Sequence, residues 1–456
     1  MGPISVEISD RVNKDLRACV IDGAAFSVMV GAGETYLPAF ALAVGLGEVA
    51  AGLLASVPML AGGVLQLVTP AGVRRFGSLR GWVVFCAALQ ALSFIPLIIF
   101  AVMGRAPAWV VYAVAALYWG SGLAASPAWN TWMERLVPKR IRVPYFAHRT
   151  RIAHAFLLAG LLGGGLTLHV VAGPGRHTLA FAALFAVAAA ARLVSAAFLA
   201  TQSEPPQDLK RHRLVTAREL LTQGRHASNA RLVLYLLGFQ AAAQLAAPYF
   251  TPFMLGQLNL SYGAYMTILA TSFLTKAVGL PLLGRLASRW GALRLLWIGG
   301  LAVAPLPALW TISHAVPYLL FLQVLGGLAW GAHELAMFLL FFETISEDER
   351  TGVLTTFNLL NALALVIGSL IGGALLETWG ENLSSYHWLF LISTLGRAVA
   401  LALLLRILVL EVPLRRFVVR TLAVRPSVGS IDRPILSSIP EPDAEDRSPD
   451  GWRTRP

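Results

Sequence analysis

The sequence predicts an all-α membrane protein, with 12 transmembrane helices in two pseudo-symmetric halves of six. Three observations predict this fold: the composition, the spacing of the apolar stretches and an internal repeat. Hydrophobic residues make up 57% of the 456 residues and charged residues only 13%, and the mean hydropathy is +0.67. This composition excludes an ordinary water-soluble enzyme and a disordered chain.

Apolar stretches alternate with short polar turns along most of the chain, and a spanning helix needs about 20 mainly apolar residues. The first half predicts helices near 18–42, 47–72, 81–104, 107–133, 152–173 and 178–200. The second half predicts helices near 232–255, 263–286, 293–313, 316–342, 352–376 and 386–411. The chain then divides into an N-terminal bundle (1–200), a polar cytoplasmic linker (201–231), a C-terminal bundle (232–411) and a largely disordered cytoplasmic tail (412–456).

Lysine and arginine residues indicate the side of the membrane that each loop faces. With a cytoplasmic N-terminus, 31 of the 36 Lys and Arg residues fall on the cytoplasmic side, two on the other side and three within spans. Cytoplasmic loops carry this excess of positive charge, so we expect both termini in the cytoplasm. The net charge of +12 therefore reflects membrane topology and not a nucleic-acid partner.

The two halves repeat each other in residues that chance similarity between apolar helices does not reproduce. The stretch Arg-Phe-Gly-Ser-Leu-Arg at 75–80 recurs 214 positions later as Arg-Trp-Gly-Ala-Leu-Arg at 289–294, and Pro38 corresponds to Pro252 at the same offset. Arg192 corresponds to Arg397 at an offset of 205. Two six-helix repeats in the same orientation are typical of transporters built about an axis along the membrane normal.

The second copy of the repeated loop resembles a family motif. Residues 284–294, Gly-Arg-Leu-Ala-Ser-Arg-Trp-Gly-Ala-Leu-Arg, resemble the loop motif Gly-x-x-x-Asp-Arg-x-Gly-x-basic-basic of the major facilitator superfamily, with Ser288 for Asp and Leu293 for a basic residue. The first copy departs further, with Pro70 at the opening Gly and Arg74 at the Asp. The organisation is similar from residue 17 to about 411, and residues 127–151 resemble a bacterial branch of the family.

This resemblance implies a secondary active transporter that moves a small solute across the bacterial inner membrane by alternating access. We expect it to work as a monomer embedded in the lipid bilayer and to be driven by protons or another coupling ion. An alternative function is a non-transporting receptor or assembly factor on a transporter scaffold. A measurement of solute flux into liposomes would distinguish a transporter from a non-transporting protein.

Charged residues flank both copies of the loop motif at the cytoplasmic ends of the helices. We expect two glycines to form the turns, and the adjacent arginines to pair with the glutamate that ends the fourth or the tenth helix. The candidate cytoplasmic gate consists of Arg75, Gly77, Arg80, Glu134, Arg289, Gly291, Arg294 and Glu343. The alternative is that the arginines only fix topology. Exposed pairs contribute about 0–1 kcal/mol each, which suits a gate that must open.

Polar stripes flanked by aromatic residues occur on the first, fourth, seventh and tenth helices, which the resemblance implies line a central cavity. The candidate cavity residues are Ser27, Trp119, Asn130, Gln240, Gln244, Lys276, Gln323 and Trp330. The alternative is that such residues help membrane helices to pack. Lys276 lies in mid-span and needs an anionic partner there, either Glu334 or an anionic substrate.

Three intramembrane carboxylates are candidates for proton coupling: Glu34, Asp22 and Glu334. We expect Glu34 to be the principal one, because it shares a helical face with Ser27 and can load a proton from outside and release it inward. An ion pair with Lys276 or a hydrogen bond to Tyr36 would instead hold it in one state. Asp22 fits a boundary residue that pairs with a cytoplasmic cation.

No sequence motif indicates a cofactor, a metal or a catalytic centre. The patterns GxxxxGK[ST], HExxH and GxSxG are missing from the sequence, and its two cysteines, Cys19 and Cys86, both lie in apolar segments. We therefore expect no cofactor, no bound metal and no enzymatic activity, and an intramembrane enzyme is the least favoured function.

Overall fold

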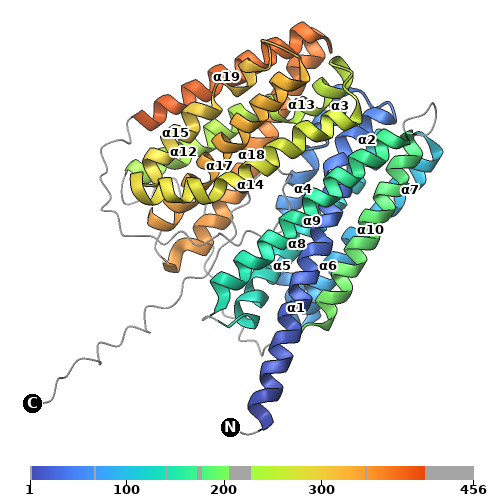
Figure 1. Ribbon diagram of the computed structural model, residues 1–456, viewed down its shortest axis with the longest axis vertical. Helices are drawn as coiled ribbons and strands as arrows, with labels where there is room; N and C mark the ends of the chain where they lie inside the picture. Colours follow the sequence, from blue (N-terminus) through green and yellow to red (C-terminus); the bar gives the residue numbers. More distant parts are fainter. Residues whose placement is uncertain are drawn as a thin grey trace, which may run out of the picture.

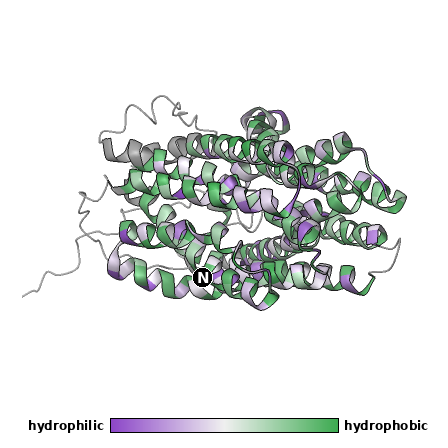
Figure 2. Ribbon diagram, turned by 90° about the horizontal axis from the view of Figure 1, so that it is seen from above, coloured by the Kyte–Doolittle hydropathy of each residue, from purple (hydrophilic) through white to green (hydrophobic). Residues whose placement is uncertain are grey.

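The computed structural model describes residues 3–65, 68–138, 141–171, 177–204, 227–344 and 347–405. Most of the expected linker and all of the expected tail from residue 412 lie outside these residues. Over the described residues the secondary structure is helical, and 12 segments are long and apolar enough to cross a membrane. Each coincides with one of the spans predicted from the sequence, so the chain is a multi-pass membrane protein. Figure 2 shows apolar residues along every helix, with hydrophilic positions scattered among them.

Several spans are assembled from shorter helices. The first half consists of α1 (Pro3–Ala32), η1 (Glu34–Tyr36), α2 (Leu37–Ala43), α3 (Glu48–Leu53), α4 (Val57–Leu65), α5 (Thr69–Phe76), α6 (Leu79–Leu92), α7 (Phe94–Met103), α8 (Ala108–Leu136), α9 (Arg142–Val170) and α10 (His177–Thr201). The second half consists of α12 (Ala227–Gln244), η4 (Ala247–Tyr249), α13 (Phe250–Pro252), η5 (Phe253–Gln257), α14 (Tyr262–Trp290), α15 (Ala292–Val303), α16 (Leu306–Leu309), α17 (Val316–Thr344), α18 (Glu347–Trp379) and α19 (Leu383–Leu405).

The first and seventh spans are interrupted at corresponding positions. After α1 the chain passes through η1 into α2, which contains Pro38, and after α12 it passes through η4 into α13, which contains Pro252. Proline lacks an N–H donor and its ring clashes with the preceding turn, so it interrupts a regular helix. The repeat seen in the sequence is therefore also a repeat of the backbone.

Glycines bring the first and fifth helices of each half into backbone contact. A Cβ atom at Gly31 of α1 would lie 2.3 Å from the carbonyl oxygen of Leu157 on α9. In the second half, a Cβ at Gly368 of α18 would lie 2.2 Å from the carbonyl oxygen of Ala241 on α12. Because only glycine permits these approaches, α1 with α9 and α12 with α18 form close-packed pairs.

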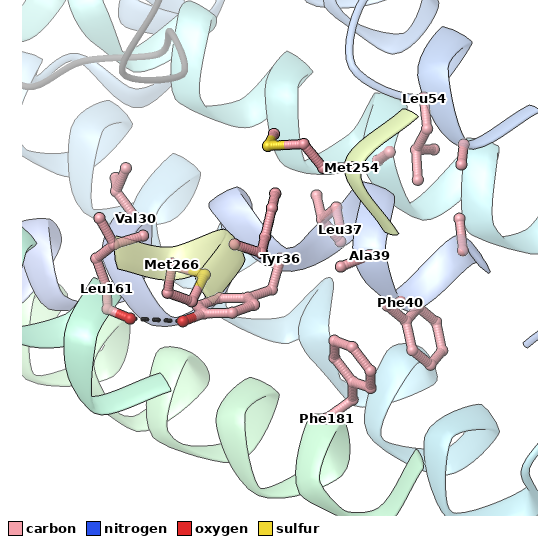
Figure 3. Packing of buried hydrophobic residues seen from close by; sticks show 14 of the residues in the cluster. Val30, Tyr36, Leu37, Ala39, Phe40, Leu54, Leu161, Phe181, Met254 and Met266 are labelled. Carbon is pink, nitrogen blue, oxygen red and sulfur yellow. Dashed lines mark hydrogen bonds between the residues drawn. The ribbon is translucent and has the colours of Figure 1, made fainter. Parts of the chain in front are cut away.

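Three clusters of buried apolar side chains show how the halves meet. One cluster is shared and includes Tyr36 of the first half and Met254 and Met266 of the second (Figure 3). A second cluster contains only first-half residues, such as Trp132, and a third contains only second-half residues, such as Leu296. The halves therefore join at the end where α2, α3 and α13 meet, here called the joined end. They diverge toward the end where α1 begins and α19 finishes, here called the termini end (Figure 1).

Candidate functional site

Lys276 of α14 and Glu334 of α17 form an ion pair in the middle of the second half. Glycines on α17 let the two helices approach, because a Cβ at Gly327 would lie 2.4 Å from the carbonyl oxygen of Ser272 on α14. The Lys276 and Glu334 side chains remain 26% and 13% exposed. A charged pair at mid-span that is not sealed from its surroundings is a candidate site for a solute or a proton.

His154 of α9 approaches this pair from the first half. Its ring centroid lies 5.4 Å from that of Phe273, which is one turn before Lys276 on α14, and the imidazole is near enough to Lys276 to interact with it electrostatically. Trp330 precedes Glu334 by one turn of α17. A cation, a carboxylate and an imidazole therefore gather where the two halves face each other, and the Trp330 indole packs against Phe239 and His333 of the second half.

A second group of charges is sealed inside the first half. Asp22 is fully buried, and its carboxylate accepts hydrogen bonds from Arg149 Nη2 at 3.2 Å and from Ser195 Oγ at 2.6 Å. Arg192 in turn donates to Ser195 Oγ at 2.6 Å and to Gln90 Oε1 at 2.8 Å. One carboxylate thus links two buried guanidinium groups, one directly and one through a hydroxyl.

The partner of Asp22 corrects the sequence analysis in one respect. We expected the fifth helix to begin near residue 152, which placed Arg149 in a cytoplasmic loop. Instead α9 begins at Arg142, and Arg149 is a buried intramembrane residue that donates from Nε to the carbonyl oxygen of Cys19 at 3.0 Å. The first turns of α9 are rich in basic residues, a composition typical of a loop, which explains the misplaced boundary.

Glu34 lies in the short 3-10 segment η1 and is only 4% exposed. Its Oε2 accepts a hydrogen bond from Tyr118 Oη of α8 at 2.7 Å. The Tyr36 hydroxyl, named as a possible partner from the sequence, donates to the carbonyl oxygen of Leu161 on α9 at 2.5 Å instead (Figure 3). Tyr118 carries no sequence signal that distinguishes it from a packing aromatic residue.

The eight candidate cavity residues fall into two groups by exposure. Four are partly exposed: Asn130, Lys276, Gln323 and Trp330. Four are buried: Ser27, Trp119, Gln240 and Gln244. Ser27 Oγ donates to the carbonyl oxygen of Gly23 at 2.8 Å, which fits a packing role more closely than a contact with a solute.

The two loop glycines adopt the conformation that a tight turn needs. Gly77 has φ +62° and Gly291 has φ +87°, a region that favours glycine. Beside the first turn, Arg80 Nη1 donates to the carbonyl oxygen of Gln202, which follows α10, at 3.0 Å. The side chains of Glu134 and Glu343 lie outside the described residues, so their pairing with Arg75, Arg289 or Arg294 stays a prediction.

Polar contacts between the two halves concentrate at the joined end, which the sequence analysis did not foresee. Glu48 of α3 accepts hydrogen bonds from Gln257 Nε2 at 2.9 and 3.1 Å and from Tyr386 Oη at 2.6 Å. The carboxylate of Glu381, between α18 and α19, accepts from the backbone N–H of Val49 at 3.0 Å and of Glu48 at 3.4 Å. We call Glu48, Gln257, Glu381 and Tyr386 the joined-end cluster. Between described residues, the hydrogen bonds that cross from one half to the other all reach the first turn of α3.

Residues 232–437 match the sequence model of the Major Facilitator Superfamily. The structure is similar to the nucleoside transporter NupG, with a TM-score of 0.66 and 14% identity, over 88% of this chain and 100% of NupG. It is also similar to a bacterial homologue of the human lysosomal transporter Spinster, with a TM-score of 0.60 and 14% identity, over 89% of this chain and 97% of the homologue. The sequence matches no curated protein.

The 12 spans in two repeated halves, together with these similarities, define a multi-pass membrane protein with the fold of a membrane transporter. In its second half the chain is similar in sequence to the Major Facilitator Superfamily, and its fold is that of the two solved transporters.

Proposed function

We propose that this protein is a proton-coupled secondary transporter that moves a small solute by alternating access. The observation that carries the proposal is the Lys276–Glu334 pair, which stays partly exposed at mid-span where the halves begin to diverge. Between the shared apolar core and the termini end, each half has an apolar core of its own. A central site closed on one side and approachable from the other is what a rocking transporter requires.

The excess of positive charge supports a cytoplasmic termini end. The described state then opens inward, and the joined-end cluster closes the outer side. To expose Lys276 and Glu334 outward, the halves must separate at Glu48 and approach each other at the termini end, where the loop arginines lie.

The ion pair offers a simple route to coupling. A solute group that binds Lys276 competes with the Glu334 carboxylate, and the released carboxylate can take up a proton in exchange. Glu334 is the more accessible of the candidate carboxylates, since Asp22 is paired with Arg149 and Glu34 is buried beside Tyr118. Trp330, Gln323 and Asn130 are the proposed solute contacts around the pair.

A disulfide staple tests alternating access. A Cβ built on Gly63 of α4 lies 3.8 Å from the Cβ of Ala362 on α18, the mean separation in a disulfide. The Gly63→Cys/Ala362→Cys protein should cross-link the halves in the described state and lose transport in liposomes, and a reducing agent should restore it. Each single cysteine variant is the control. Full transport by the cross-linked protein would exclude rocking.

Proton coupling is tested by uptake into liposomes under a pH gradient. Radiolabelled nucleosides are the first probe, because the similar structures include a nucleoside transporter. A thermal-shift screen of metabolites at two pH values supplies others. Glu334→Gln should abolish accumulation but retain energy-independent exchange, whereas Glu377→Gln, at an exposed carboxylate on α18, should leave both accumulation and exchange unchanged. If Glu334→Gln still accumulates solute and Glu34→Gln does not, the coupling site is Glu34.

A further inference from the structure

A groove on the surface of the first half runs between α1, α9 and α10. Its volume is about 360 Å³, and its lining side chains are all apolar, among them Ile21, Ala25, Val28, Ile152, Phe156 and Val194. Figure 1 shows α1 between α9 and α10 in this part of the molecule. The small residues of α1 and α10 hollow the surface between larger exposed side chains such as Ile21 and Phe156.

Cations gather at the termini end of this groove. On α1, Arg17 precedes Ile21 by four residues and Lys14 precedes it by seven, so both share the helical face of Ile21. On α9, His148 precedes Ile152 by four residues and Arg151 is its neighbour. All four side chains are exposed. Four residues of helix rise about 6 Å, so Arg17 and His148 lie just beyond the apolar lining, whereas Arg151 lies level with Ile152 on the adjacent face of α9.

These cations have no acidic partner among the described residues. The ion pairs seen there involve Arg149 with Asp22 and Lys276 with Glu334, and neither includes Lys14, Arg17, His148 or Arg151. An apolar groove that ends in a net excess of positive charge at the edge of the membrane, with four cations against Asp10 among the described residues, matches the two parts of an anionic lipid.

We propose that this groove binds an anionic phospholipid, with one acyl chain between α1, α9 and α10 and the phosphate held by Arg17 and Arg151. A zwitterionic headgroup fits less well, because its ammonium group would lie among the same cations. A second copy of the chain fits less well too, since a two-fold contact places the same patch on both subunits and so brings like charges together.

Lipid binding should stabilise the folded protein. The inner faces of the same three helices carry Asp22, Arg149 and Arg192, so a lipid across the groove holds together the helices that the buried charges connect. A ligand that binds only the folded state raises the unfolding temperature progressively as its free concentration exceeds its dissociation constant. This effect gives a readout that needs no knowledge of the transported solute.

The test is a titration of the full-length protein in detergent, with its unfolding temperature followed as dioleoyl phosphatidylglycerol is added. Dioleoyl phosphatidylcholine and soluble glycerol 3-phosphate are the comparison probes. We expect phosphatidylglycerol alone to raise the unfolding temperature. Arg17→Gln/Arg151→Gln should weaken its apparent affinity by roughly 10- to 30-fold, at about one order of magnitude or less per arginine. The matched control Arg74→Gln/Arg285→Gln removes two exposed arginines from the termini end elsewhere and should leave the affinity unchanged.

A second variant tests the groove itself. Ala25→Phe fills part of it and should weaken phosphatidylglycerol binding while the unfolding temperature without lipid stays near that of the parent. Equal stabilisation by phosphatidylcholine, or equal loss in both arginine variants, would overturn the proposal. So would an Ala25→Phe protein that changes its oligomeric state but binds the lipid normally, because the groove would then be a contact between copies of the chain.

Discussion

The two halves share one fold but place their charges in opposite ways. In the first half, Arg192 connects through Ser195 to the buried carboxylate of Asp22. In the second half, the corresponding Arg397 donates to the backbone carbonyl oxygens of Val303 at 3.0 Å and Ala243 at 3.4 Å. Leu236 stands where the repeat would place an equivalent of Asp22.

The reverse holds at the centre of the molecule. The second half exposes Lys276 and Glu334, whereas the corresponding positions of the first half are Gly62 and Ala125. Buried ionic groups resist rearrangement, while a partly exposed pair can exchange partners. In the rocking movement proposed above, the first half would therefore be the more rigid body and the second half would carry the charges that can exchange partners.

The largest effect should follow from breaking the buried network. Asp22→Leu gives the first half the residue of the second half and leaves Arg149 without its carboxylate. Losing one partner of a buried pair costs about 3–5 kcal/mol, so the free energy of unfolding in detergent should fall by that amount. The double variant Asp22→Leu/Arg149→Met should recover most of the loss.

Arg397→Met is the comparison in the second half. Because the described residues place no carboxylate against Arg397, its removal strands no charge and should cost less than about 2 kcal/mol. Equal losses of unfolding free energy for Asp22→Leu and Arg397→Met would show that the buried charges of the two halves contribute equally to stability.

The exposed pair should behave in the opposite way, with a large effect on transport and a small one on stability. Lys276→Met or Glu334→Gln should reduce solute accumulation under a pH gradient at least about tenfold, or about 1.4 kcal/mol. Each single change leaves a charge unpaired in a poorly solvated site, so the double variant should be more stable than their additive sum. If the change in unfolding temperature of the double variant equals the sum of the two single changes, Lys276 and Glu334 do not act as a pair.

A smaller shift is expected from the joined-end cluster. Tyr386→Phe removes the hydroxyl that donates to Glu48, and one hydrogen bond contributes about 1 kcal/mol. The population of the described state should therefore fall about fivefold relative to a state open at the joined end. The rate of cross-linking between cysteines at positions 63 and 362 measures this population. An unchanged rate would mean that the cluster does not hold the halves together.

The smallest effect should come from the loop arginines. Glu134→Lys should slow transport, and adding Arg75→Glu or Arg80→Glu should restore it. Exposed ion pairs contribute about 0–1 kcal/mol, so the change in rate should be less than about fivefold. If neither double variant transports faster than Glu134→Lys, the pairing predicted for the cytoplasmic gate is wrong. Arg75→Glu is the cleaner partner, because Arg80 also bonds to Gln202.

Hydropathy and length were sufficient to predict the 12 spans, because a membrane requires a long apolar helix for each crossing. The ion pair of Lys276 was foreseeable for a related reason, since an ammonium group at mid-span needs an anion nearby. The joined-end cluster was not foreseeable. Glu48 and Glu381 lie at the ends of spans, where a charge needs no special explanation, and they are 333 residues apart in the chain. Such a contact depends on how the halves dock, which local sequence patterns do not record.

The pairing of Asp22 with Arg149 also has a consequence for biosynthesis. The two residues are 127 positions apart, and three further spans are made between the first span and α9. At about 5–20 residues per second, the nascent chain holds Asp22 for roughly 6 to 25 s before Arg149 has been made. A charged aspartate at mid-helix costs about 2.5–3.5 kcal/mol to insert, a cost that Arg149 can offset only after it has been made. The order in which the ribosome delivers the helices therefore sets the time at which the first half can close around its charges.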